Sequence, residues 1–268
     1  MPETGSKTVP ALDPALSRDC HLVHQVGPAE WSYSVLANTF HAVLDGGSQP
    51  IADPGWSETP LLHYAYDRVT RISLSRFVTV VPAVAAPDDD TARGHLALLF
   101  RDLPPGSTVR TESLHLDDDL VIVFAEDDHP AVDDLHPDTT VSHAMTGLLR
   151  HWHYYARQIA SGLFVHVEDG LLIVGRMNER GVELANTYPV EHAEDAAFIL
   201  LHLYDGLDLD PETVPLVRSG LPATDTMDLV ADHVRTIQPM ERPISLRYAP
   251  GVEQLDGARF VHHYARLL

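Results

Sequence analysis

The sequence contains very little lysine and cysteine, and both shortages exclude specific chemistries. Lys7 is the only lysine among 268 residues, and Cys20 is the only cysteine. A phosphate-binding Walker A loop needs a lysine in a glycine-rich turn after a strand, and Gly5-Ser6-Lys7 has no strand before it. A lysine Schiff base is equally disfavoured. A single cysteine excludes internal disulfides and cysteine-based zinc clusters, and suits a reducing compartment.

Positive charge is scarce as well. The 18 Lys and Arg residues stand against 39 Asp and Glu residues, which gives a formal net charge of −21. Such a charge repels nucleic-acid backbones and anionic membranes unless a local basic patch intervenes, and no run of arginines provides one. The longest clean apolar stretch, 196–201, is far shorter than the roughly 20 residues that cross a bilayer. We therefore expect a cytoplasmic protein that binds neither nucleic acid nor membranes.

The acidic excess has two interpretations. Asp outnumbers Glu about two to one, and arginine carries nearly all of the positive charge. At roughly 1 M salt the Debye length is near 3 Å, so that repulsion between surface carboxylates is screened. The composition therefore fits halophilic adaptation, and it fits equally an ordinary acidic protein encoded in GC-rich DNA. Both interpretations stay open.

The first half of the chain predicts a meander of strands followed by helices. A short helix is expected from Thr59-Pro60 to Tyr66, because proline is favoured at the first helical position. Asp88 to Asp90 indicate a second helix start, since acidic residues favour the first turn. A third helix is expected over 145–158. The predicted strands are 21–25, 31–36, 40–44, 69–74, 77–81 and 120–124.

The second half repeats this order more legibly. Glu168-Asp169-Gly170 separates two apolar runs, and its Asp-Gly pair favours a tight hairpin. A helix over about 194–204 is expected to end before Gly206, because glycine is common just after a helix. A strand leads into Ser219-Gly220, and Asp225 is placed to cap a helix that reaches Ile237. The predicted strands are 164–167, 171–174, 182–185, 214–217 and 244–248, with a terminal helix over 260–268.

This repetition predicts a duplicated chain. We expect a mobile N-terminal tail at 1–18, because this stretch is polar and contains proline. A first lobe is expected over 19–160 and a second over 161–268.

Several separated motifs carry a resemblance to a known family. They are Phe77-Val78-Thr79-Val80-Val81-Pro82, His143, Leu184-Ala185-Asn186-Thr187-Tyr188, Glu194-Asp195 and Val217-Arg218-Ser219-Gly220. Together they resemble the bacterial family called domain of unknown function 3822, from about His21 onward, and 163–225 resembles the second half of an actin-like fold. The resemblance implies an α/β, duplicated actin-like (RNase H-like) fold of two lobes, each with a mixed sheet and flanking helices. It implies no reaction, because the family has no established activity.

The resemblance also indicates where a nucleotide would bind. In nucleotide-binding members of the superfamily, each half begins with an Asp-x-Gly turn that approaches phosphate and organises the metal. The first turn here reads Gln25-Val26-Gly27-Pro28, where glutamine lacks the charge that Mg²⁺ prefers and Pro28 lacks an amide donor. If ATP and Mg²⁺ bind, the cofactor-binding candidates are Glu168, Asp169, Gly170, Ser219 and Gly220. Otherwise these turns are hairpins and a strand–helix corner inherited with the fold.

Histidine is abundant, at 17 residues, but its spacing gives no metal motif. Residues three apart in a strand face opposite sides, and residues two apart in a helix diverge. The close pairs that diverge in this way are His21 and His24, and His151 and His153; the adjacent residues His262 and His263 diverge as well. We therefore expect no metal site, and no nucleophile motif such as Gly-x-Ser-x-Gly assigns a catalytic residue.

Three functions follow from these observations. The first is a non-catalytic interaction module with degenerate phosphate-binding turns, no cofactor and a protein partner that the sequence does not identify. The alternative is a divergent ATP-binding phosphotransferase or ATPase that uses the cleft between the lobes. The third is a His/Asp metallohydrolase. Homo-oligomerisation is left open, because actin-like folds often self-associate.

Overall fold

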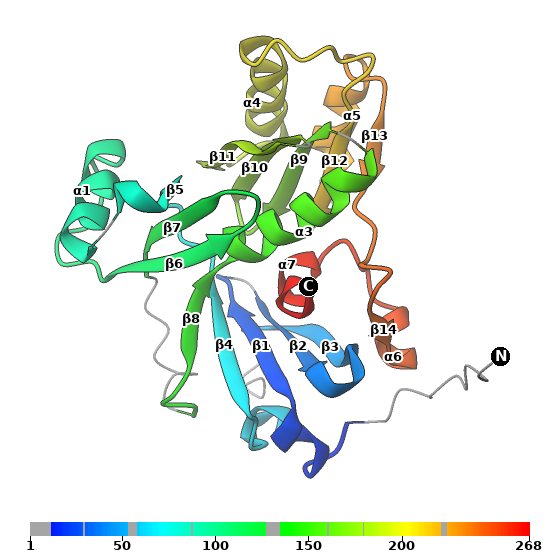
Figure 1. Cartoon of the computed structure of the whole chain (residues 1–268). Helices are drawn as coiled ribbons and strands as arrows, with labels where there is room; N and C mark the ends of the chain where they lie inside the picture. Colours follow the sequence, from blue (N-terminus) through cyan, green and yellow to red (C-terminus); the bar gives the residue numbers. More distant parts are fainter. Residues whose placement is uncertain are drawn as a thin grey trace.

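The computed structural model describes residues 12–28, 30–52, 58–86, 88–126, 135–159, 161–178, 180–220 and 224–268. Two mixed sheets lie on either side of helix α3 (Ala144–Ile159), and a small third sheet stands to one side (Figure 1). Residues 1–11 of the predicted N-terminal tail lie outside these ranges. The later part of that segment includes a 3-10 helix, Leu16–Asp19, in which the buried Ser17 hydroxyl donates to the carbonyl of Ala65.

The first sheet combines an antiparallel meander with parallel strands. Its strands are β1 (His21–Val26), β2 (Glu30–Ala37), β3 (Ala42–Pro50), β4 (Arg68–Ser73), β8 (Thr140–His143) and β14 (Arg247–Tyr248). Their order is β14-β3-β2-β1-β4-β8, with β1 to β3 antiparallel and β4 and β8 parallel to β1 and β4.

The second sheet repeats this plan. Its strands are β9 (Ser161–Glu168), β10 (Leu171–Asn178), β11 (Gly181–Pro189), β12 (Leu216–Gly220) and β13 (Ile237–Pro239). Their order is β11-β10-β9-β12-β13, with three antiparallel strands followed by two parallel ones. Apart from β14, the first sheet has the same order, so the predicted duplicated actin-like fold is confirmed.

The third sheet is inserted between β4 and β8. It consists of β5 (Val78–Pro82), β6 (Val109–His115) and β7 (Asp119–Ala125), all antiparallel. Helix α1 (Asp89–Leu99) packs on it through Ala92 and Leu96. The helix begins where predicted, because the Asp88 carboxylate accepts a hydrogen bond from the amide of Thr91.

One core joins the two main sheets. Trp152 of α3 stacks against Phe164 of β9, with ring centroids 5.8 Å apart. The indole also lies over Gly175 of β10, where an added Cβ would come within 2.5 Å of its ring. Helices α4 (Ala193–Gly206) and α5 (Thr224–Ala231) cover the other face of the second sheet. The short helices α6 (Pro250–Glu253) and α7 (Val261–Tyr264) return to the first sheet and α3.

Two predicted elements differ in the structure. Helix α5 ends at Ala231 rather than Ile237, because Ile237 begins β13 and pairs with β12. The strand expected over 244–248 is reduced to β14, which joins the first sheet beside β3. Part of the segment that the sequence assigns to the second lobe therefore belongs to the first sheet. The lobe boundaries otherwise stay a prediction.

Two local predictions were also wrong. The helix expected from Thr59-Pro60 is a 3-10 turn, Pro60–His63. Helix α4 runs through Gly206, and the left-handed residue after it is Asp208, with φ 52°. An aspartate tolerates this conformation better than most side chains, so glycine is not required there.

Candidate functional site

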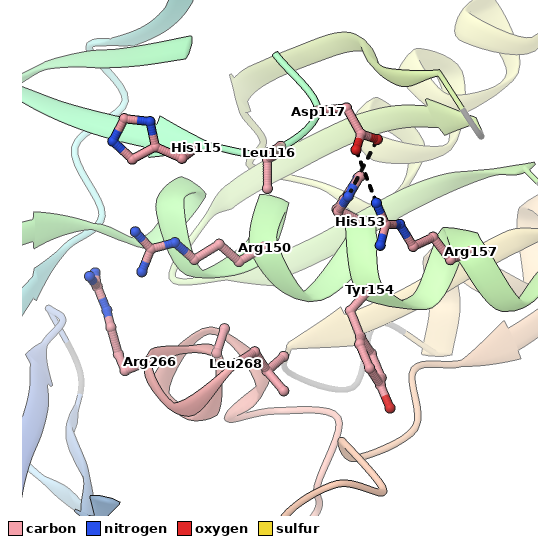
Figure 2. Close-up of a pocket in the computed structure, with 10 residues that line it drawn as sticks. His115, Leu116, Asp117, Arg150, His153, Tyr154, Arg157, Arg266 and Leu268 are labelled. Carbon is pink, nitrogen blue, oxygen red and sulfur yellow. Dashed lines mark hydrogen bonds and ion pairs between the residues drawn. The ribbon is translucent and has the colours of Figure 1, made fainter. Parts of the chain in front are cut away.

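An open cavity of about 460 Å³ lies beside α3. It is lined by the β6–β7 turn, by one side of α3 and by the C-terminal segment (Figure 2). Arg150 and Arg266 turn their guanidinium groups toward one another at one end of it (Figure 2). At the other end Asp117 pairs with Arg157 at 3.0 Å and with His153 at 3.5 Å.

Arg150 has an unusual position in this cavity. Arg266 bonds Glu112 at 3.1 Å, whereas Arg150 makes no hydrogen bond or ion pair with any residue that the structure describes. Burial, and then the neighbouring Arg266, lower the pKa of Arg150. The Glu112 carboxylate partly opposes this effect. In a chain with a formal charge of −21, the cavity thus presents a half-buried cation that has no direct ion pair among the described residues.

The two turns that would hold phosphate lie at the junction of the main sheets, and they are in contact. Asp169 and Gly170 have φ values of 49° and 75°, in keeping with the tight hairpin predicted from the Asp-Gly pair. A Cβ added to Gly27, in the opposite turn, would come within 1.7 Å of Asp169 Oδ2. Only a glycine at position 27 allows this approach, and the Asp169 carboxylate lies against the first turn.

The Asp169 carboxyl titrates unusually. Burial raises its pKa to about 6, and the nearby carboxylates of Glu168 and Glu30 act in the same direction. Arg259 opposes this rise. Its guanidinium is already bonded to Glu30 and, at 3.1 Å, to the hydroxyl of Ser48. An anionic phosphate placed here would meet carboxylates on the second-lobe side.

Ser219 and Gly220 lie at the end of β12, and both are buried in the protein. Gly220 has φ 89°, and a Cβ there would come within 2.2 Å of the carbonyl oxygen of Val167. Its amide donates to the carbonyl of Ala258 at 3.2 Å. The Ser219 hydroxyl lies 3.0 Å from His166 Nδ1 and 3.1 Å from the carbonyl oxygen of Val165. Both the amide and the hydroxyl therefore already have protein partners.

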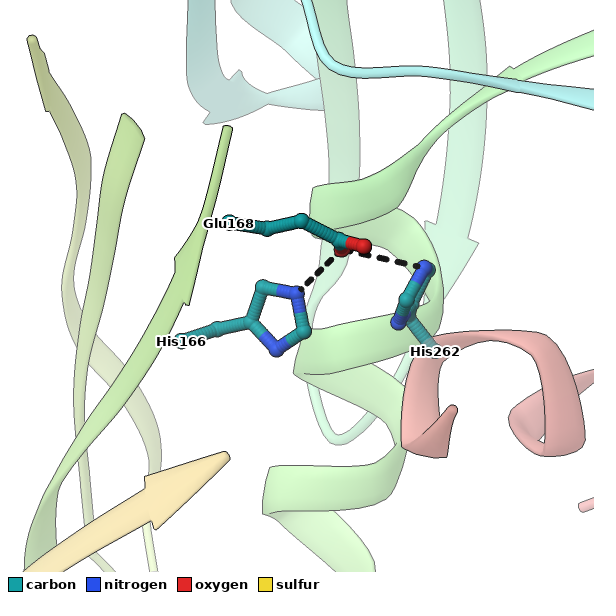
Figure 3. Close-up of side chains that lie close together, drawn as sticks. All are labelled: His166, Glu168 and His262. Atoms are coloured by element: carbon teal, nitrogen blue, oxygen red, sulfur yellow. Dashed lines mark hydrogen bonds and ion pairs between the residues drawn. The ribbon is translucent and has the colours of Figure 1, made fainter. Parts of the chain in front are cut away.

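Glu168 belongs to a buried polar cluster. Its Oε2 lies 2.9 Å from Nε2 of His166, two residues earlier on β9, and 3.8 Å from Nε2 of His262 on α7 (Figure 3). The three ligand atoms all lie within 4.8 Å of one another, and all three side chains are buried. They are the residues at this junction that could hold a metal ion.

Helix α7 supplies two neighbouring histidines to the junction. His262 Nε2 lies 2.9 Å from Gln25 Oε1 at the end of β1, and His263 Nδ1 lies 3.1 Å from Ser34 Oγ on β2. Burial holds the pKa of both histidines well below the usual range. Gly147 of α3 makes this placement possible, since a Cβ there would come within 2.2 Å of the His262 carbonyl oxygen.

Comparison with known proteins agrees with this architecture. A family described as "Protein of unknown function (DUF3822)" matches residues 54–237. The chain belongs to the DUF3822 family. No curated protein is similar enough to this DUF3822 chain to count as a match.

Two solved structures share the fold. One is a protein from Bacteroides thetaiotaomicron described as having an actin-like ATPase fold and unknown function; it is 15% identical, with a TM-score of 0.75, over 96% of this chain and 99% of that chain. The other is the PilM-PilN type IV pilus biogenesis complex, at 12% identity and a TM-score of 0.54 over 93% of this chain and 98% of that chain. Both matches concern the fold alone. Of the helices that the structure describes, none combines the length and apolar character that a membrane span requires.

Ser219, His166 and Glu168 form a hydrogen-bonded chain in the order hydroxyl, imidazole and carboxylate, which is the order found in the catalytic triads of hydrolases. All three side chains are buried, with exposures of 4%, 0% and 3%. A nucleophilic serine must be reachable by its substrate, so this arrangement fits a structural network rather than a catalytic one.

The five candidate residues of this DUF3822 chain thus have different surroundings. Glu168 and Ser219 meet through His166, whereas Asp169 faces Gly27. Gly170 and Asp169 also border a surface cavity of about 470 Å³ beside the starts of α4 and α5. The sequence did not predict that His166 and His262 lie beside Glu168, because the spacing between histidines carries no information about carboxylates. The signal for the first was His166-x-Glu168, since residues two apart on a strand share a face.

Proposed function

We propose that this protein is a non-catalytic interaction module built on an actin-like scaffold. The observation that carries the proposal is the contact between Asp169 and Gly27, which places a carboxylate against the first of the two turns. Phosphate binding requires backbone amides that point into an open space. Two of the expected donors are missing, because Pro28 has no amide hydrogen and the amide of Gly220 is bonded to Ala258.

The charges at the junction support the same proposal. Mg²⁺ takes oxygen ligands and usually keeps several waters, so it needs carboxylates that reach solvent. Glu168 is 3% exposed and is bonded to His166, and Gln25 carries no charge. Neither side chain is arranged to hold a hydrated cation beside a triphosphate.

The cavity beside α3 is the surface that we assign to a partner. It is open, and it contains Arg150, which forms no direct ion pair with any described residue. A carboxylate or phosphate group matches an arginine by two parallel hydrogen bonds. The PilM-PilN complex is an example of this fold in a complex between proteins. The partner we propose is a protein that inserts an anionic group here, because a net charge of −21 disfavours nucleic acid.

Calorimetry with Mg-ATP tests the proposal against the alternative of a phosphotransferase or ATPase. We expect no binding in the micromolar range. As a matched comparison, Asp169→Gly removes the carboxylate from the gap and keeps the backbone conformation, which glycine favours. It should also fail to bind, since Pro28 and Gly220 still offer no free amide. Micromolar binding by the unaltered protein would overturn the proposal.

A further inference from the structure

Arg259 and Arg266 act electrostatically on His262 and His263 at the junction, but neither forms an ion pair with the buried carboxylate of Glu168. Glu168 is 3% exposed, and no arginine or lysine in the described part of the chain forms an ion pair with it. Arg259 acts on the neighbouring Asp169, but its guanidinium is bonded to Glu30 and Ser48. A buried carboxylate is costly unless a positive charge or several hydrogen bonds compensate for it. Within the described ranges, the ion-pair partners of Glu168 are two imidazole rings, and imidazole is a common metal ligand.

We infer that His166, Glu168 and His262 bind a divalent cation of the zinc class through Nε2, Oε2 and Nε2. Their donor atoms lie within 4.8 Å of one another, with the shortest separation 2.9 Å. In a tetrahedral zinc site with bonds of about 2.0–2.1 Å, donor atoms are roughly 3.3 Å apart. Small side-chain shifts therefore bring all three to bonding distance.

The donor types select the ion. Two imidazole nitrogens and one carboxylate oxygen suit zinc, whereas magnesium and calcium take oxygen ligands almost exclusively. Gln25 Oε1, 2.9 Å from His262 Nε2, offers a further oxygen. One carboxylate and two neutral imidazoles carry one negative charge, so a bound dication leaves one positive charge, and the neighbouring Asp169 carboxyl group lies close enough to interact with it.

His166 also has the outer partner that metal-bound histidines need. In such a histidine the N–H group of the second ring nitrogen normally donates a hydrogen bond to an acceptor, which fixes the orientation of the ring. His166 Nδ1 lies 3.0 Å from Ser219 Oγ, and this hydroxyl in turn reaches the Val165 carbonyl. Ser219 is therefore a positioning residue for the site.

The site joins the two sheets. His166 and Glu168 come from β9 of the second sheet, whereas His262 comes from α7. The residue after it, His263, contacts Ser34 on β2 of the first sheet. Because all three side chains are buried, the cation holds the lobes together rather than acting on a substrate. This inference is independent of the proposed interaction function.

Metal content and thermal unfolding of the full chain test the site. The protein must carry no polyhistidine tag, since a tag would bind the metal itself. After incubation with Zn²⁺ and dialysis, the unaltered protein should retain one zinc per chain. His166→Gln and Glu168→Gln should lose it, and His151→Gln, which alters a buried histidine outside the cluster, should keep it. Ser219→Ala keeps the three ligands and should weaken zinc binding about tenfold.

Two results would overturn the inference. One is unaltered protein that holds no more zinc than Glu168→Gln, which would mean that a shared proton rather than a metal balances the carboxylate. The other is stoichiometric zinc that persists in both ligand variants. If those variants do not fold, the unaltered protein decides. A strong chelator must lower its Tm and added Zn²⁺ must restore it, and a Tm that responds to neither contradicts the site.

Discussion

Asp169 Oδ2 packs against Gly27 so closely that it lies 1.7 Å from the point where a side chain at position 27 would place its Cβ. The turn after β1 and the turn after β9 therefore depend on one another. A glycine is needed on one side because a carboxylate stands on the other.

Gly27→Ala should destabilise the protein by about 1–2 kcal/mol, because the added methyl group displaces the Asp169 carboxylate from a half-buried position. Urea denaturation measures the change. In an Asp169→Gly background the same substitution should cost much less, since the obstacle is gone. A double-mutant cycle gives the coupling, and two additive effects would contradict the contact.

Gly147→Ala should be more damaging, by about 3 kcal/mol, because the obstacle is backbone. Its Cβ would come within 2.2 Å of the His262 carbonyl oxygen, so α7 must move away from α3. Gly94→Ala on α1 is the matched control. Nothing lies within 4 Å of its added Cβ, and alanine favours the helix by about 1 kcal/mol, so this variant should be slightly stabilised. Equal effects at the two positions in thermal unfolding would refute the close packing of α7.

The sequence was sufficient to predict the repeated succession of strands and helices along the chain and the Asp169-Gly170 hairpin. Both follow from local signals, namely short apolar runs and a residue pair that accepts positive φ. It was not sufficient for β13 and β14, which contain three and two residues. Such short strands exist only because β12 and β3 offer free edges, and these edges are formed by distant parts of the chain.

The buried cluster could be predicted only in part. His166 and Glu168 share a strand face, so their proximity is local. His262 joins them because the chain returns past the first sheet and because Gly147 admits α7. Periodicity carries no information about such a long-range approach. The divergence of His262 and His263 was a sound inference, but divergent rings can still find separate partners, here Gln25 and Ser34.

Arg150→Gln should abolish anion binding in the cavity beside α3. In the unaltered protein, millimolar inorganic phosphate should raise the Tm, because a ligand that binds only the folded state stabilises it. Arg93→Gln, on the exposed face of α1, removes the same charge elsewhere and should retain the effect. Without phosphate, Arg150→Gln should be no less stable than the unaltered protein, since it relieves repulsion with Arg266. An equal phosphate response in both variants would exclude this cavity as the site.

His151 should make the protein sensitive to acid. It is fully buried on α3, its Nε2 donates to the Glu241 carbonyl at 3.1 Å, and its ring lies 6.3 Å from that of Tyr154. Burial lowers its pKa to about 4, and the hydrogen bond to Glu241 only partly opposes this. An unfolded histidine titrates near 6.5. Between these two pKa values His151 is protonated in the unfolded chain and neutral in the folded chain. The free energy of unfolding therefore falls as the pH decreases from about 6.5 to about 4.

The full contribution is on the order of 3 kcal/mol, and below pH 4 this residue adds no further loss. Urea denaturation at intervals from pH 7 to pH 4 measures it. His151→Gln keeps a donor for the Glu241 carbonyl and cannot be protonated, so its stability should fall less steeply, by up to about 1.4 kcal/mol per pH unit. His21→Gln should remove a second increment, because burial followed by Arg266 and Arg68 lowers the pKa of His21 to about 3. Parallel curves for His151→Gln and the unaltered protein would mean that the folded chain admits the proton at position 151.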